Sequence, residues 1–134
     1  MVEESSYMFI TGPEVIKTVT NEEVSFEDLG GASTHGTKSG VSHFTVADDE
    51  AAIQMARDLC DLLPQNNLER PPSKKTNDPI DRSCDALDSI MPDQATKAYD
   101  VVDVITEILD DGGFLEVQAD WAQNIVVGFG HLGG

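Results

Sequence analysis

Residues 6–17 read Ser-Tyr-Met-Phe-Ile-Thr-Gly-Pro-Glu-Val-Ile-Lys, and this stretch sets the pattern of the fold. Its apolar part, residues 7–10, predicts a short buried strand. Thr11 can cap a following helix, because Glu14 stands three residues later and Pro13 suits the first turn. A strand that leads directly into a helix is typical of an α/β fold.

A second helix start follows at Ser25, and the glycines Gly30 and Gly31 are expected to end that turn almost at once. Residues 30–40 contain four glycines and other small side chains. We therefore expect a loop with little intrinsic structure there. The apolar residues within 41–46 predict a strand after this loop.

The clearest helical pattern of the chain lies in residues 49–63, with Asp48 in position to cap it. Its apolar residues recur at helical spacing and form one stripe, made of Ile53, Ala56, Leu59, Cys60 and Leu63. We expect this stripe to pack on a core, which would make Cys60 a buried thiol. Pro64 ends the pattern.

Residues 64–80 contain four prolines and many polar residues, which is typical of a stiff, extended linker. Residues 81–97 show no clear periodicity and are expected to be irregular. A new αβ pattern then begins. Its expected members are a helix at 99–109, a strand at 114–117, a short helical turn at 119–122 and an apolar strand at 125–129.

The charge of the chain excludes several classes of partner. Its 25 acidic and 8 basic residues give a net charge of −17. Such a surface repels nucleic acid and disfavours anionic membranes, since both are bound through Lys and Arg. No apolar run approaches the roughly 20 residues of a membrane span, and the first residues lack a signal-peptide pattern. We therefore expect no nucleic-acid partner and no membrane insertion.

The cysteines and histidines indicate neither a disulfide framework nor a metal site. Cys60 and Cys84 are few and unpaired by motif, so a reducing, cytoplasmic compartment is the default expectation. His35, His43 and His131 lie in no sequence context typical of zinc ligands. We expect this chain to bind no metal.

The layout is unusual for a complete domain. Two αβ stretches flank the proline-rich segment, and each is too small to bury a core of its own. The strand expected at 125–129 would lie at a sheet edge, and an uncovered apolar edge strand invites aggregation. The sequence therefore predicts that polypeptide from outside these 134 residues completes the fold.

Residues 30–40 are the one stretch in which a chemical role can be proposed. No nucleophile elbow, Walker loop or dinucleotide fingerprint is present. The run Gly30-Gly31-Ala32 could bring backbone N–H groups close to an oxyanion or a phosphate, with His35 and Lys38 beside it. A tight turn that merely requires glycine is the alternative, and the pattern alone does not decide between the two.

Several motifs in order resemble the carboxyltransferase subunits of biotin-dependent acyl-CoA carboxylases, with propionyl-CoA carboxylase β chains the most similar. The resemblance begins in the opening stretch 6–17 and covers nearly the whole chain in one collinear run. Its further motifs are Asp28-Leu-Gly-Gly-Ala-Ser-Thr-His35, Ser39-Gly-Val-Ser-His43, Leu63-Pro-Gln-Asn-Asn67, Asp78-Pro-Ile-Asp-Arg82, Lys97-Ala-Tyr-Asp100 and Asn124-Ile-Val-Val-Gly-Phe129. The sequence departs from the family at Gly130-His131, where Ala-Arg is usual, so this chain lacks the family's arginine there.

The resemblance implies a crotonase-like (ClpP-like) α/β fold, a spiral of ββα units in two domains. It places residues 1–67 at the end of the N-domain, 68–96 in the interdomain linker and 97–134 at the start of the C-domain. Both oxyanion holes of the family then fall outside this chain, so it holds no catalytic residue. The residues expected to line the acyl-CoA site or a subunit interface are Gly30, Gly31, Ala32 and His35.

The resemblance also implies a reaction and partners. The reaction is transfer of a carboxyl group from carboxybiotin to the α-carbon of an acyl-CoA, with propionyl-CoA the expected substrate. Biotin would arrive on a partner carrier domain, and the full subunit would form a homo-hexamer working with a biotin carboxylase subunit. It would act in the cytoplasm, or in the mitochondrial matrix of a eukaryote. The alternatives are a biotin-dependent decarboxylase of methylmalonyl-CoA or glutaconyl-CoA, and a non-catalytic stand-alone protein.

Overall fold

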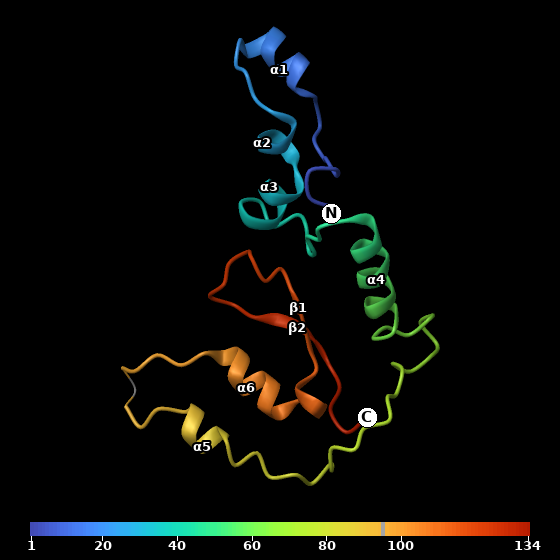
Figure 1. The fold of residues 1–134 in the computed structure, drawn as a ribbon, viewed down its shortest axis with the longest axis vertical. Coiled ribbons are helices and arrows are strands. Elements are labelled where there is room, and N and C mark those ends of the chain that lie inside the picture. The colour runs from blue at the N-terminus through green and yellow to red at the C-terminus, as the bar shows by residue number, and fades with distance from the viewer. Residues whose placement is uncertain (95) are drawn as a thin grey trace. The chain divides into compact units, whose positions relative to one another are not determined.

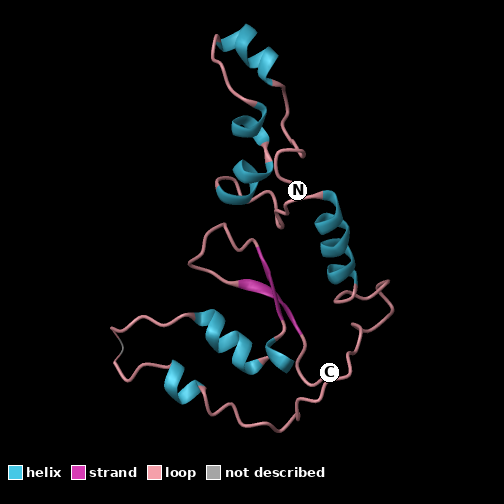
Figure 2. Ribbon diagram, in the orientation of Figure 1, coloured by secondary structure: helices cyan, strands magenta, loops and turns pink. Residues whose placement is uncertain are grey.

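The structure is a computed structural model that describes residues 1–94 and 96–134 (Figure 1). It divides into two compact units. The first unit contains Met1–Leu59 and Gln118–Ile125, and the second contains Cys60–Val117 and Val126–Gly134. Residue 95 of the expected linker 68–96 lies outside the described residues. The mixture of helices with one pair of strands in the described chain gives an α/β composition (Figure 2).

The first unit contains four helices. They are α1 (Pro13–Thr20), α2 (Phe26–Gly30), α3 (Ala32–Thr37) and α4 (Asp49–Cys60). Two of them, α2 and α4, begin at a capping side chain. The Ser25 hydroxyl accepts a hydrogen bond from the Asp28 amide at 3.0 Å, and Asp48 Oδ1 accepts from the Ala51 amide at 2.8 Å. Each side chain satisfies an N–H group that the first helical turn leaves without an intrahelical partner.

The second unit contains two helices, a 3₁₀ turn and a β-hairpin. These are α5 (Leu87–Ile90), α6 (Val101–Ile108), η1 (Asp110–Gly112), β1 (Phe114–Val117) and β2 (Val127–Gly130). The strands are antiparallel, with Phe114 opposite Gly130 and Val117 opposite Val127. The Asp100 carboxylate begins α6 by accepting from the Val102 amide at 2.9 Å. The predictions of α6 and of both strands are therefore confirmed, with β2 displaced towards the C-terminus.

The strands expected at 7–10 and 41–46 are wrong. The first forms one isolated bridge, Tyr7 to Gly31, and the second one, Val46 to Val2. Ile10 is fully exposed rather than buried. A strand needs a neighbour that pairs with its backbone groups along its length, and the described residues provide each segment with a single bridging position.

The loop expected at 30–40 is also wrong, because residues within it form α3. Ala32 is 0% exposed, and a Cβ atom on Gly36 would lie 2.7 Å from the Thr45 Oγ1 atom. Small side chains here permit close packing of a short helix rather than flexibility. Thr11 does not cap α1 either. The N-cap residue is Gly12, and no side chain accepts a capping hydrogen bond from the first turn of α1.

Three further expectations differ from the structure. The helix expected over 49–63 ends at Cys60, whose thiol is exposed rather than buried. The segment expected to be irregular contains α5, with Leu87 and Ile90 half-buried. Residues 119–122 form a turn instead of a helix, in which the Trp121 amide donates to the Gln118 carbonyl at 2.9 Å.

Neither unit encloses an apolar core among its described residues. Ala32 is the buried apolar side chain, while large side chains such as Ile10, Val19 and Leu68 are more than three-quarters exposed. Ala56 and Leu59 of the predicted stripe line a groove of about 340 Å³, together with Ala52 and Met55 of α4 and residues of the 41–46 segment. Ile53 is instead more than half exposed, so the predicted stripe is only partly the packing face of α4. Burial of apolar surface stabilises a protein by roughly 25 cal/mol per Å². Further polypeptide that covers these exposed apolar faces would therefore stabilise the fold.

Salt is expected to stabilise the chain against heat. Among the described residues there are three ion pairs, whereas the net charge is −17. Raising NaCl from 0.1 to 1 M shortens the screening length from about 10 to about 3 Å, which weakens repulsion between the excess carboxylates more than it weakens the few attractive pairs. Circular dichroism should show a higher Tm at 1 M. A lower Tm would show that the ion pairs dominate.

Candidate functional site

The structure brings Gly30, Gly31, Ala32 and His35 together around the junction of α2 and α3. The two glycines and Ala32 are buried. The Met8 amide donates to the Gly30 carbonyl at 2.8 Å, and a Cβ on Gly30 would lie 2.2 Å from the Met8 carbonyl oxygen. Residue 30 must therefore be glycine for the N-terminal segment to approach this closely.

Two N–H groups of this junction, those of Gly31 and Ser33, are engaged by Glu27. The Gly31 amide donates to the Glu27 carbonyl at 2.9 Å, and Glu27 Oε1 accepts from the Ser33 amide at 3.2 Å. Glu27 Oε2 is buried and has no hydrogen-bond partner among the residues that the structure describes. The first turn of α3 thus faces a carboxylate and is not an open anion-binding site in this structure.

Both ring nitrogens of the half-buried His35 make short hydrogen bonds. Nε2 lies 2.6 Å from the Met8 carbonyl oxygen, and Nδ1 lies 2.7 Å from Ser39 Oγ. Because a carbonyl only accepts, Nε2 carries the hydrogen, and in the neutral ring Nδ1 accepts from the Ser39 hydroxyl. His35 therefore connects α3 to the N-terminal segment, and neither nitrogen is left to contact a ligand.

Residues far along the chain also hold this region. Gln118 Nε2 donates to the Gly40 carbonyl at 2.5 Å, and the Gln118 amide donates to the His43 carbonyl at 3.0 Å. The Ser42 amide donates in turn to the His35 carbonyl at 3.1 Å. Sequence reasoning missed Gln118, because no motif or periodicity distinguishes it from other polar turn residues.

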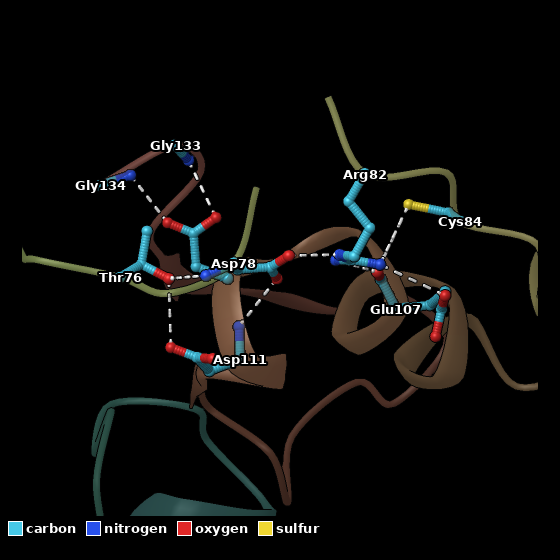
Figure 3. Close-up of polar contacts among 9 residues, drawn as sticks. Thr76, Asp78, Arg82, Cys84, Glu107, Asp111, Gly133 and Gly134 are labelled. Atoms are coloured by element: carbon cyan, nitrogen blue, oxygen red, sulfur yellow. Dashed lines mark hydrogen bonds and ion pairs between the residues drawn. The ribbon is translucent and has the colours of Figure 1, made fainter. Parts of the chain in front are cut away.

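A second group of polar contacts lies at the C-terminal end of α6 (Figure 3). Arg82 Nε donates to Asp78 Oδ1 at 2.5 Å, Nη2 to the Glu107 carbonyl at 2.8 Å, and Nη1 to Glu107 Oε1 at 3.4 Å. The guanidinium thus satisfies a carbonyl of the last helical turn, where a cation is also favoured by the helix dipole. The i, i+4 spacing of Asp78 and Arg82 could have predicted their pairing.

The acidic residues after α6 complete this network, which involves the residues labelled in Figure 3. Asp78 Oδ2 accepts from the Asp111 amide at 3.2 Å. The Asp110 carboxylate accepts from the Gly133 and Gly134 amides at 2.9 and 2.8 Å, and its own amide donates to the His131 carbonyl at 3.0 Å. The proline-rich segment is therefore fastened to the end of α6, and the contact that His131 makes there uses its backbone.

The same contacts shift the pKa values of Asp78 and Arg82. The hydrogen bond from Arg82 lowers the pKa of the Asp78 carboxyl below 3.8, against the opposing effect of burial and with help from the Asp111 amide. The hydrogen bond to Asp78 likewise raises the pKa of the Arg82 guanidinium. Both groups are therefore charged at neutral pH, and the network has the character of a structural clamp rather than of an acid–base site.

Asp78→Asn is expected to remove a pH-dependent part of the stability. The folded-state pKa of Asp78 is depressed from 3.8, so its contribution is present above the unfolded-state pKa and is lost as pH falls through the folded-state value. Urea unfolding should show the variant less stable than the parent at pH 7, with the difference shrinking below about pH 4. A difference that stays constant from pH 7 to pH 2.5 would contradict this assignment.

No group of three or more His, Cys, Asp or Glu side chains in residues 1–94 and 96–134 could hold a metal ion. Among these residues, no helix has the length and apolar character required to cross a membrane.

Known proteins match the chain along its whole length. A family model described as the carboxyl transferase domain matches residues 1–134. The chain is 54% identical over 134 residues to the propionyl-CoA carboxylase carboxyltransferase subunit of Haloferax mediterranei and covers 26% of it. It is 45% identical to the mitochondrial propionyl-CoA carboxylase beta chain of Homo sapiens, again over all of this chain and 25% of the relative.

A solved structure shows the same fold. The transcarboxylase 12S, reported as a hexamer with methylmalonyl-coenzyme A and methylmalonic acid bound, superposes with a TM-score of 0.87 at 45% identity. The match covers 93% of this chain and 24% of that one. The chain thus spans about a quarter of the length of the relatives that it matches. With its α/β, crotonase-like fold, the chain belongs to the carboxyl transferase domain family.

Proposed function

We propose that these residues are an internal piece of a carboxyltransferase subunit that moves a carboxyl group from carboxybiotin to the α-carbon of propionyl-CoA, giving methylmalonyl-CoA. The observation that carries this proposal is the 54% identity to a propionyl-CoA carboxylase subunit over the whole chain. Within that subunit, residues 1–67 end the N-domain, 68–96 form the linker, and 97–134 begin the C-domain.

The exposed apolar faces support the placement within a longer subunit. Ala52, Met55, Ala56 and Leu59 of α4 line an apolar groove, and a second groove of about 400 Å³ lies between α6 and the β-hairpin. Both are surfaces that further layers of a ββα spiral would cover. Each Å² of apolar surface that such layers bury is expected to stabilise the fold by roughly 25 cal/mol.

Gly30, Gly31, Ala32 and His35 are proposed to shape the acyl-CoA side of the site or a subunit interface. Their support is the close approach of the N-terminal segment, which requires glycine at residue 30. The donors that stabilise the thioester enolate and the biotin ureido oxyanion come from outside this chain. Biotin arrives on a partner carrier, and the subunit forms a homo-hexamer that works with a biotin carboxylase subunit in the cytoplasm or mitochondrial matrix.

The test is carboxyl transfer by the complete subunit. Together with its biotin carboxylase and carrier partner, it is expected to convert propionyl-CoA into methylmalonyl-CoA in the presence of ATP and bicarbonate, as measured by incorporation of labelled bicarbonate. The 134-residue chain alone is expected to be inactive. Turnover by the isolated chain, or failure of the complete subunit with every acyl-CoA tested, would overturn the proposal.

A decarboxylase is the second candidate, and one relative favours it. The chain is 46% identical over its whole length to the methylmalonyl-CoA decarboxylase subunit alpha of Propionigenium modestum. Glutaconyl-CoA is the other substrate expected for such a decarboxylase. A carboxylase and a decarboxylase of this family run the same carboxyl transfer in opposite directions. A neighbouring reading frame for a biotin carboxylase favours the carboxylase, whereas one for a multi-span membrane subunit favours the decarboxylase. A true ribosome site before Met1 together with a stop codon after Gly134 would favour a non-catalytic stand-alone protein.

A further inference from the structure

The turn that joins β1 to β2, residues 118–125, packs within the first unit rather than with its own strands. We propose that two residues of this turn, Gln118 and Trp121, are positioning residues that hold residues 39–43, and through them His35, in the arrangement that binds acyl-CoA. This inference rests on the proposed function. It assigns a role on the acyl-CoA side of the site to two residues that follow the expected linker 68–96 in the sequence.

Gln118 makes two hydrogen bonds to the same short stretch. Its side-chain amide donates to the Gly40 carbonyl at 2.5 Å, and its backbone amide donates to the His43 carbonyl at 3.0 Å. Together they fix both ends of residues 40–43, because the carbonyls they engage are three residues apart. These contacts join the turn to a segment 78 residues away in the sequence. We infer that the turn and residues 40–43 are held together as one structural piece.

Trp121 covers the same stretch with its ring. A Cβ atom on Gly40 would lie 2.6 Å from the indole Nε1, so the ring rests directly on the glycine backbone. Gly40 has a φ of +67°, a conformation that favours glycine. Contact and conformation therefore both require glycine at residue 40, and Trp121 takes up the space that a side chain would fill.

The backbone of the turn indicates that these contacts help to determine its shape. Gln118 and Ala122 have φ values of +58° and +49°, which residues other than glycine and asparagine rarely adopt. Such residues persist only where surrounding contacts hold them. Hydrogen bonds within the turn contribute, and the contacts that Gln118 and Trp121 make with residues 40–43 join it to the rest of the first unit.

From residues 39–43 the connection continues to the predicted site. Ser39 Oγ bonds to His35 Nδ1 at 2.7 Å, and the Ser42 amide donates to the His35 carbonyl at 3.1 Å. The His35 ring then reaches the Met8 carbonyl, beside which Gly30 is packed. Each step is a direct contact, so loosening the turn removes support from the side chain that orients the Gly30–Ala32 junction.

The test compares Gln118→Met with Gln123→Met in the complete subunit. Methionine keeps the length of glutamine and removes the amide donor at either position. Gln123 serves as the matched control, because it lies in the same exposed turn and its side chain bonds within the turn, to the Ala119 carbonyl at 3.2 Å. Hydrogen exchange of residues 39–44 and calorimetric titration with propionyl-CoA are measured for both variants.

For Gln118→Met we expect faster exchange of the Ser42 amide and a Kd for propionyl-CoA raised about fivefold, the factor for one ordinary hydrogen bond. For Gln123→Met we expect neither change. His35→Gln, whose amide can still donate to the Met8 carbonyl, is expected to bind propionyl-CoA more tightly than His35→Ala. Equal exchange and equal Kd in the Gln118 and Gln123 variants would overturn the inference.

The result separates this inference from the proposed function. If the unmodified subunit binds no acyl-CoA, the proposed function fails, and the role assigned to Gln118 and Trp121 fails with it. If the unmodified subunit binds and carboxylates propionyl-CoA while the two methionine variants behave alike, the proposed function stands and only the positioning role is rejected. A variant that aggregates is replaced by Trp121→Phe, which keeps a ring over Gly40 and should lose less affinity than Trp121→Ala.

Discussion

Gly30→Ala is expected to destabilise the first unit by about 1–3 kcal/mol, the range for forcing extra atoms into a packed site. The new Cβ would lie 2.2 Å from the Met8 carbonyl oxygen and 2.9 Å from its carbon. These are backbone atoms, so rotation of a side chain cannot relieve the clash. The N-terminal segment must withdraw, which also breaks the hydrogen bond from the Met8 amide to the Gly30 carbonyl.

Urea unfolding followed by the fluorescence of Trp121, the single tryptophan of the chain, measures this loss. Gly31→Ala is the matched comparison, because its Cβ would meet the carboxylate of Glu27, the far end of a flexible side chain. Gly12→Ala is the second control, with the nearest atom in ordinary contact at 3.7 Å. If all three variants lose the same stability, the approach of Met8 to Gly30 is not what requires glycine.

Arg82→Met is expected to give the largest loss of stability among the charged residues of the second unit. The change removes the donors to Asp78, to the Glu107 carbonyl and to the Glu107 carboxylate at once. It leaves a carboxylate and a helix-terminal carbonyl without their partner, and an unpaired acceptor costs more than the net value of the bond it made. The segment containing Asp78 should then separate from α6.

Native-state hydrogen exchange of α6 and of residues 76–84 measures this effect. Arg82→Lys keeps the charge but cannot make the forked contacts of a guanidinium, so it should fall between the parent and Arg82→Met. Arg70→Met is the control, because Arg70 is exposed and belongs to the same unit. Exchange that is unchanged in Arg82→Met but faster in Arg70→Met would show that the clamp does not hold this segment.

Most of the described helices were predictable because their signals are local, whereas the short helices α3 and α5 were not predicted. Ser25, Asp48 and Asp100 each accept a hydrogen bond from an amide at the start of the helix they precede, and such bonds depend on residues two or three positions apart. The apolar pattern likewise located the hairpin strands. The ordered motifs were sufficient to predict the family, which the match over residues 1–134 confirms.

The candidate site was predictable in composition but not in arrangement. The glycines and His35 stood out as a small-residue run, and the structure does bring them together. Whether they line a ligand site stays a prediction. Their role in packing depends on Met8 and on Gln118, and the sequence contains no pattern that pairs residue 40 with residue 118. That pairing arises only when the backbone turns at positive φ.

The sequence by itself determined the family, the starts of α2 and α4 and the excess of negative charge, because each follows from neighbouring residues or from composition. The tertiary structure decided which apolar segments become strands, why Gly30 and Gly40 must be glycine, and what Arg82 holds. These outcomes depend on contacts between residues distant in sequence, whose geometry is set by packing and by hydrogen-bond partners rather than by local preference. Residues 7–10 and 41–46 have strand-like patterns, yet without a pairing neighbour along their length they do not form strands.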